Sequence, residues 1–233
     1  MTPARPKRLF LPALCALLAL VFAGLGVWQV ERLAWKRDLI ARVEARLAAA
    51  PEELPPRASW TKLDPREIEY RRVRVRGVFD LANTTFVDAL TERGAGNWVL
   101  TPLRTGEGTI IVNRGFAPKG WNDPPREAAP VEIIGLMRLS EPNGRFLRAN
   151  RPGDNAWYSR DIAAIAAARG LSGVAPFFID AAVGSPADAY PIGGMTVVHF
   201  RNAHLVYALT WFGLAALCGF GLALMVRNKH NGG

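Results

Sequence analysis

The side chains with the clearest capacity for chemistry surround His204, at the start of a long apolar stretch. His204, Ala208 and Trp211 share one face of a predicted helix, and Tyr207 lies beside them. A neutral imidazole is a common ligand of metals and of haem iron, and the small Ala208 with the flat Trp211 would leave a slot for an apolar planar ligand. Arg201, about one turn earlier, could meet a carboxylate on such a ligand. The alternative is a histidine at a membrane interface, hydrogen-bonded to headgroups or backbone.

A second group of polar and aromatic residues follows the first apolar stretch. Trp28, Arg32 and Trp35 are spaced so that they form one stripe on a helix, with Gln29 next to Trp28 and Lys36 next to Trp35. Tryptophans with cationic neighbours are typical of a membrane interface, where they anchor a helix at headgroup level. The same stripe could instead contact a partner or a ligand.

Signatures of enzymes are missing from the sequence. It contains no HExxH, GxSxG, GxxxxGK[ST] or GxGxxG pattern. Between the two apolar stretches His199 is the one histidine, which disfavours a zinc or copper site made by protein ligands alone. The cysteines, Cys15 and Cys218, lie within the apolar stretches and form no CxxC pair, so thiol–disulfide exchange is excluded. We therefore expect no catalytic residues; the alternative is an enzyme, such as an undetected hydrolase or a haem-modifying activity, for which the sequence offers no pair of nucleophile and base.

The elements that position these groups begin with two membrane helices. Residues 9–30 and 203–226 contain no Asp, Glu, Lys or Arg, and each is longer than the roughly 20 helical residues that cross a bilayer. A cleaved signal ending at Ala23 is the competing interpretation of the first stretch. The apolar run continues through Trp28, which is unusual for such a signal.

Charge predicts how these helices are oriented. The tails, residues 1–8 and 227–233, carry basic residues and no acids, which is typical of cytoplasmic segments. We expect a multi-pass protein of the inner membrane with both termini cytoplasmic and residues 31–202 in the periplasm. The chain has 29 Lys+Arg and 20 Asp+Glu, and this excess of positive charge is too small to indicate a nucleic-acid-binding protein. We expect the excess basic residues to contact anionic headgroups of membrane lipid.

Residues 31–202 read as one strand-rich α+β domain, barrel-like, between the two transmembrane helices. The first helix is expected to continue to residue 50, where Pro51 ends it and a linker through Ser59 begins. Arginines alternate with Val73, Val75 and Phe79, as in a half-buried strand. Gly77 suggests a bulge or a close backbone approach. The expected strands are 69–79, 84–87, 97–103, 109–113, 131–139 and 175–182.

Two local features accompany these strands. A helix is predicted over 162–168, with Ser159 as its N-cap and Gly170 at its end. Gly94 and Gly96 are expected in a turn. Residues 118–130 and 184–194 are expected to be loops.

Four separated segments resemble the surfeit locus protein 1 family. They are GVWQVERLAWK at 26–36, YRRVRVRGVF at 70–79, VNRGF at 112–116 and RNAHLVYALTWF at 201–212. They occur in order, and the resemblance extends over nearly the whole chain with both apolar stretches in place. The family comprises assembly factors of cytochrome c oxidase, and its members promote formation of the haem a centres in oxidase subunit I. The resemblance therefore implies oxidase assembly, with haem a as a transient cargo.

The resemblance also carries over to individual positions. The family's histidine falls on His204, and its Trp-Gln and Arg positions fall on Trp28, Gln29 and Arg32. The family's strand glycine falls on Gly77, and its Asn-Arg-Gly turn falls on Asn113, Arg114 and Gly115, which we expect to be structural or partner-binding. The expected haem-binding set is His204 (to the haem iron), Arg201, Tyr207, Trp211, Trp28, Gln29 and Arg32.

Two hypotheses follow for the mode of action. In the first, the protein receives haem a from haem a synthase, holds it with His204 and presents it to oxidase subunit I. In the second, it is a membrane scaffold that stabilises subunit I during haem loading without binding haem. In that case the face carrying Arg72, Arg74 and Arg76 would dock the partner, although a solvated strand face is the simpler interpretation of these arginines.

Overall fold

The computed structural model describes residues 7–123, 129–145, 147–184, 189–196 and 203–230. The chain divides into two compact units. One, the helical unit, combines residues 1–42 with residues 199–233, and the other, the barrel unit, comprises residues 43–198.

Two long helices make up the helical unit, α1 (Lys7–Ala48), whose last turns lie in the barrel unit, and α4 (His204–His230). The segments Phe10–Ala48 and His204–Arg227 are both long and apolar enough to cross a membrane. As predicted, α1 continues without interruption beyond its apolar part, and it ends at Ala48, shortly before Pro51. The helices pack through aromatic and small residues, with the Phe22 and Trp211 rings stacked 5.6 Å apart.

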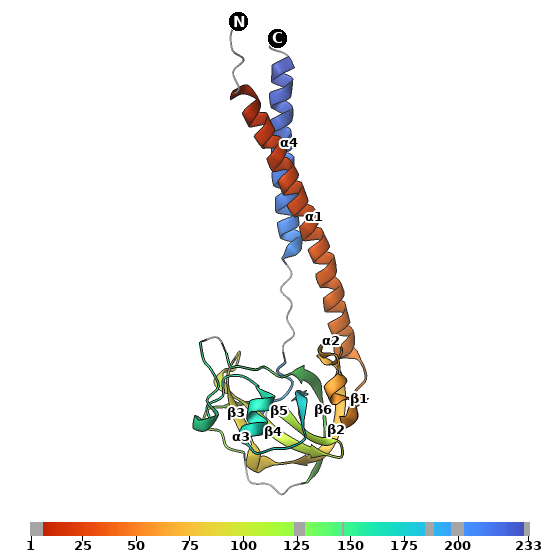
Figure 1. Cartoon of the computed structure of the whole chain (residues 1–233), viewed down its shortest axis with the longest axis vertical. Helices are drawn as coiled ribbons and strands as arrows, with labels where there is room; N and C mark the ends of the chain where they lie inside the picture. The colour runs from red at the N-terminus through yellow and green to blue at the C-terminus, as the bar shows by residue number, and fades with distance from the viewer. Residues whose placement is uncertain (1–6, 124–128, 146, 185–188, 197–202, 231–233) are drawn as a thin grey trace. The chain divides into compact units, whose positions relative to one another are not determined.

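The barrel unit is built on one sheet with the strand order β1-β2-β6-β7-β5-β4-β3. An additional pairing joins β2 to β4, at Val78↔Arg104 and Phe79↔Leu103. It closes the strands β2, β6, β7, β5 and β4 into a barrel (Figure 1). The strands are β1 (Glu52–Glu53), β2 (Arg72–Phe79), β3 (Thr85–Thr91), β4 (Gly94–Thr105), β5 (Gly108–Pro118), β6 (Pro130–Leu139) and β7 (Val174–Ala181). The strand-rich, barrel-like fold between two apolar helices is therefore confirmed.

Most strand pairs in the barrel are antiparallel. The exceptions are β5 with β7 and the short β1 with β2, which are parallel. A parallel pair needs a crossover connection, and the chain between β6 and β7 supplies α3 (Ile162–Ala168). This helix packs beside β7 and brings the residues just before it close to the end of that strand.

Alternation along the strands produces two apolar clusters. Val73, Ile110 and Phe177 belong to the cluster inside the barrel, whereas Ile111 and Phe178 belong to the cluster under α3. Neighbouring residues of β5 and of β7 thus pack on opposite faces of the sheet. Both strands are covered on both faces, which is why their sequences read as continuous apolar runs.

Short helices occupy several of the connections, and the first of them begins within the predicted linker. They are η1 (Arg57–Lys62), α2 (Pro65–Ile68), η2 (Leu81–Asn83) and η3 (Pro152–Asp154). Trp60 of η1 packs edge-on against Phe177, at a centroid distance of 5.7 Å. The predicted linker 51–59 therefore includes the start of an element that contributes to the core.

Two local predictions were wrong. Gly94 and Gly96 lie in β4, and the turn before that strand is formed by Glu92 and Arg93. Gly96 is needed for close packing, since a Cβ there would lie only 2.4 Å from a ring carbon of Phe116 and from the Ala117 carbonyl oxygen. The N-cap of α3 is Asp161, whose carboxylate accepts from the Ala164 N–H at 3.1 Å.

Candidate functional site

His204 is the first residue of α4, and its ring is held by a residue of α1. The distance from His204 Nδ1 to Gln29 Oε1 is 2.8 Å. An amide oxygen can only accept a hydrogen bond, so Nδ1 is the donor, and in the neutral ring this arrangement leaves the lone pair on Nε2. Within the described residues no other group is hydrogen-bonded to this ring. The arrangement leaves Nε2 able to ligate a metal ion or a haem iron.

The stripe expected after the first apolar stretch divides into two faces. Gln29 is 8% exposed and lies on a buried face of α1 with Gly26 and Leu33. Trp28 and Arg32 are exposed, and the Arg32 guanidinium carbon lies 4.1 Å from the ring centroid of Trp35, which is also exposed. The structure therefore brings Gln29 to His204 and places Trp28 and Arg32 on the outer surface of α1.

The slot expected beside Ala208 and Trp211 is filled by α1. Ala208 is only 2% exposed, and Trp211 stacks on Phe22. One turn closer to the histidine along α1, Gly26 lets the Phe212 ring approach: a Cβ on that glycine would be 2.6 Å from a ring carbon. Helix packing thus occupies the face that was predicted to receive a planar ligand.

The remaining members of the expected haem-binding set lie elsewhere. Tyr207 is exposed on α4, about one turn after His204. Arg201 and His199 fall outside the described residues, so their predicted roles stay predictions. Among the described residues, no group of three or more His, Cys, Asp or Glu side chains is placed to hold a metal ion.

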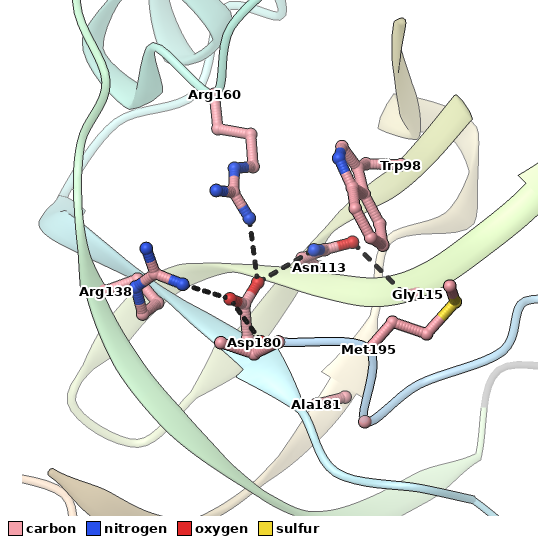
Figure 2. Close-up of a pocket in the computed structure, with 10 residues that line it drawn as sticks. Trp98, Asn113, Gly115, Arg138, Arg160, Asp180, Ala181 and Met195 are labelled. Atoms are coloured by element: carbon pink, nitrogen blue, oxygen red, sulfur yellow. Dashed lines mark hydrogen bonds and ion pairs between the residues drawn. The ribbon is translucent and has the colours of Figure 1, made fainter. Parts of the chain in front are cut away.

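The barrel unit contains a buried polar cluster that the sequence did not indicate. Asp180 on β7 is 4% exposed and accepts four side-chain hydrogen bonds (Figure 2). The donors are Asn113 Nδ2 at 2.8 Å, Thr196 Oγ1 at 2.8 Å, Arg138 Nη1 at 3.0 Å and Arg160 Nη1 at 3.3 Å. They come from β5, β6, the approach to α3 and the segment after β7, so one carboxylate joins four parts of the fold.

A cavity of about 200 Å³ adjoins this cluster. Figure 2 shows Trp98 and Met195 on the side of the cavity opposite Arg138. The carboxylate of Asp180 is already supplied with four donors, so it is neither a free base nor an open cation ligand. The cluster has the character of a structural junction.

The charges around Arg160 stabilise one another. Burial disfavours the charged form of Glu141, but the hydrogen bonds and positive charge of Arg160 outweigh this and lower the pKa of the carboxyl. Burial likewise disfavours the charged guanidinium, whereas Glu141 and then Asp180 raise the pKa of Arg160 above its ordinary value. Arg160 donates from Nε to Glu141 Oε2 at 3.0 Å.

The Asn-Arg-Gly segment, which was expected to form a turn, lies instead within strand β5, next to this junction. Asn113 bonds Asp180 with its amide nitrogen and accepts the Gly115 N–H at 3.2 Å with its amide oxygen. Gly115 has φ +126°, and a Cβ there would collide with the carbonyl of Ile192. Arg114 is buried in an ion pair with Asp123. This part of β5 thus packs closely against Ile192 and Gly193.

Gly77 and the arginines of β2 have partners within the same sheet. A Cβ on Gly77 would collide with the Arg104 carbonyl, so this glycine allows β2 to approach β4 closely where the barrel closes. Arg74 and Arg76 both pair with Glu132, through Nε–Oε distances of 3.4 and 2.8 Å. The face predicted to be basic is therefore a mixed-charge face.

The SURF1 family model matches residues 16–216. Surfeit locus protein 1 of Homo sapiens is 38% identical over 234 residues, covering 91% of this chain and 76% of that protein. The Mus musculus protein of the same name is 39% identical, covering 84% of this chain and 69% of its own. A SURF1-like protein of Monosiga brevicollis is 35% identical, covering 90% of this chain and 84% of its own.

Proposed function

The chain belongs to the SURF1 family, and from that premise we propose that it delivers haem a to subunit I of cytochrome c oxidase. A role in assembly of the oxidase follows from the family. The proposal adds that the protein holds haem a transiently, with His204 as the ligand of the iron, between haem a synthase and subunit I. It acts as a carrier and carries out no catalysis.

One observation carries this proposal: the hydrogen bond between His204 Nδ1 and Gln29 Oε1 at 2.8 Å. In a neutral imidazole this bond supports the tautomer with Nε2 free, the form in which histidine ligates haem iron. The site lies at the end of a helix long and apolar enough to cross a membrane, and the hydrophobic farnesyl tail of haem a needs such surroundings.

Because α1 fills the slot beside Ala208, the haem would lie on the outer surface of the helix pair. Trp28 and Tyr207 expose their rings there. Trp28 adjoins Gln29 in sequence, and Tyr207 is about one turn from His204, so exposed aromatic rings accompany both members of the His204–Gln29 pair and could pack on a planar group. An open site of this kind suits a carrier, which must release its cargo.

We further propose that the protein spans the inner membrane twice, with both termini cytoplasmic and the barrel unit in the periplasm. The acid-free tails support this orientation. Exposed Trp28 and Trp35, with Arg32 over the latter ring, suit the outer headgroup layer. His204 would then lie near the outer face of the membrane, with lipid as its surroundings.

The experiment is haem analysis of the protein co-expressed with haem a synthase and purified in mild detergent. We expect haem a in the wild type and its loss in His204→Ala. His230→Ala is the matched control, since it makes the same substitution at the opposite end of α4, and it should retain haem. Equal haem content in both variants would contradict the proposal.

Absence of haem from the intact wild type would favour a scaffold that stabilises subunit I without cargo. The observation that favours this second function is the filled slot beside Ala208 and Trp211. The scaffold would still co-purify with subunit I. Its contacts would involve a mixed-charge face, because Arg74 and Arg76 are paired with Glu132.

A further inference from the structure

We infer that Gln29 is the positioning residue of His204: it selects the ring tautomer in which Nε2 is the only nitrogen able to bind a ligand. The inference deepens the proposed function and rests on it for its purpose. The tautomer itself is a property of the haem-free protein and can be measured without any cargo.

The burial of Gln29 indicates that its amide has a specific task. It lies in α1 within a long apolar segment, and it is 8% exposed. A buried amide without a hydrogen bond is costly, and His204 Nδ1 at 2.8 Å satisfies its oxygen. A leucine at this position would fill similar space and suit an apolar helix better, so the hydrogen bond to His204 is the physical role that the amide has here.

The orientation of the amide decides whether the histidine can act as a ligand. With Oε1 toward Nδ1, the imidazole donates from Nδ1 and Nε2 keeps its lone pair. With the amide nitrogen in that place, Nδ1 would accept and Nε2 would carry the proton. Both ring nitrogens would then be occupied, so the two orientations predict opposite tautomers and opposite capacities for ligation.

Packing between the helices holds the two groups together. Gly26 lies one turn before Gln29 and admits the Phe212 ring, and Phe22 stacks on Trp211 one further turn along α1. These contacts pack the turns of α1 before Gln29 against Trp211 and Phe212 of α4. The ligand-ready tautomer is therefore a property of the packed helix pair, supplied by α1 to a histidine on α4, as residues beyond the first ligand commonly do in metal sites.

Nitrogen NMR of the full chain in lipid nanodiscs tests the inference. The chain contains three histidines, so ¹⁵N labelling of histidine gives few signals, and His204→Ala identifies those of His204. We expect Nδ1 protonated and Nε2 unprotonated in the haem-free wild type. Gln29→Leu should lose this preference, whereas Gln29→Glu should keep it, because a carboxylate oxygen also accepts from Nδ1. An Nε2-protonated wild type, or an unchanged tautomer in Gln29→Leu, would overturn the inference.

A packing control separates positioning from a merely structural role. Leu33 lies on the same buried face of α1, one turn beyond Gln29. Leu33→Ala removes packing and leaves the amide, so the Nδ1-protonated tautomer should persist. A loss of that tautomer in Leu33→Ala equal to the loss in Gln29→Leu would assign the effect to packing and contradict the inference. If Gln29→Leu does not fold, the wild-type tautomer and Gln29→Glu decide the question.

Haem titration provides the second readout. Loss of a hydrogen bond that orients a histidine ligand commonly weakens metal binding about 10–100-fold, and we expect a loss in that range for Gln29→Leu. Gln29→Glu should restore most of the affinity. If His204→Ala still binds haem, the proposed ligation by His204 is contradicted, whereas the inference about the tautomer is not affected. Haem binding lost in His204→Ala but unchanged in Gln29→Leu would instead end the inference alone.

Discussion

Thr196 donates its hydroxyl to the Asp180 carboxylate at 2.8 Å. The bond fastens the last described segment of the barrel unit to the middle of the sheet. Backbone hydrogen bonds hold the same segment. Ile192 and Phe116 exchange two of them, at 2.8 and 2.9 Å, and the Gly194 N–H donates to the Ala181 carbonyl at 2.8 Å. Residues 192–196 are thus held by side-chain and backbone bonds together.

Removing the Asp180 carboxylate should destabilise the barrel unit strongly. Asp180→Ala leaves Arg138 and Arg160 without their shared buried partner, and breaking a buried ion pair from one side costs about 3–5 kcal/mol. Urea unfolding of the full chain in detergent, followed by tryptophan fluorescence, measures the loss. Asp154→Ala is the control, because Asp154 pairs with Arg151 at an exposed site. It should change the free energy of unfolding by no more than about 0.5 kcal/mol; equal losses in the two variants would contradict the role given to Asp180.

A side chain at Gly115 should also destabilise the fold. Gly115→Ala combines an unfavourable φ of +126° with a collision at the Ile192 carbonyl, and overpacking costs typically about 1–3 kcal/mol. Gly106→Ala is the matched control, since a Cβ there meets no atom within 4 Å. The midpoint of thermal unfolding measures both. A midpoint for Gly115→Ala as high as that of Gly106→Ala would refute the proposed close approach.

Acid should weaken the barrel unit through Glu141. Its pKa is lower in the folded protein than in the unfolded chain, although burial acts in the opposite direction, because Arg160 bonds and pairs with it. A lowered folded pKa contributes stability above the unfolded pKa of about 4.3, and that contribution disappears as pH falls through the folded pKa.

The measurement is the thermal midpoint between pH 7 and pH 3, in wild type and in Glu141→Gln. The variant cannot lose this carboxylate charge, so its midpoint should start lower at pH 7 and decline less on acidification. Parallel declines in the two proteins would show that Glu141 does not contribute to the acid sensitivity.

Packing between α1 and α4 should determine whether Gln29 reaches His204. Gly26→Ile would displace the Phe212 ring, which lies 2.6 Å from the position of a Cβ, and so separate Gln29 from His204. We expect weaker haem binding and loss of the Nδ1-protonated tautomer. Gly24→Ile is the matched control, because a Cβ at Gly24 meets nothing within 4 Å. If Gly24→Ile and Gly26→Ile weaken haem binding equally, the effect comes from bulk in the membrane and not from helix packing.

The strands and helices were predictable where one periodicity dominates. The absence of charge indicated α1 and α4, and the alternation of Val73 and Val75 with arginines indicated β2. Gly77 was correctly linked to a close backbone approach. Capping was harder to predict, since Ser159 and Asp161 are both good N-cap residues. Ser159 instead donates its hydroxyl to the Glu141 carbonyl at 2.7 Å, which only the folded chain reveals.

The polar junction at Asp180 was not predictable from spacing. Its donors at positions 113, 138, 160 and 196 are far apart in sequence and meet because β5, β6 and β7 are neighbours in the sheet. A carboxylate at the end of the apolar run Phe177–Ile179 was the one available signal. Similarly, helical spacing placed Ala208 and Trp211 on the face of His204, but it did not show that α1 covers that face.

The haem content of His204→Ala, compared with that of His230→Ala and the wild type, tests the central claim most directly. All three proteins are co-expressed with haem a synthase, purified in mild detergent and analysed by their pyridine-haemochrome spectra. We predict haem a in the wild type and in His230→Ala, and its loss in His204→Ala with helix content preserved. Haem a retained in His204→Ala would contradict ligation by this histidine, and a wild type that is folded and free of haem would contradict the carrier itself.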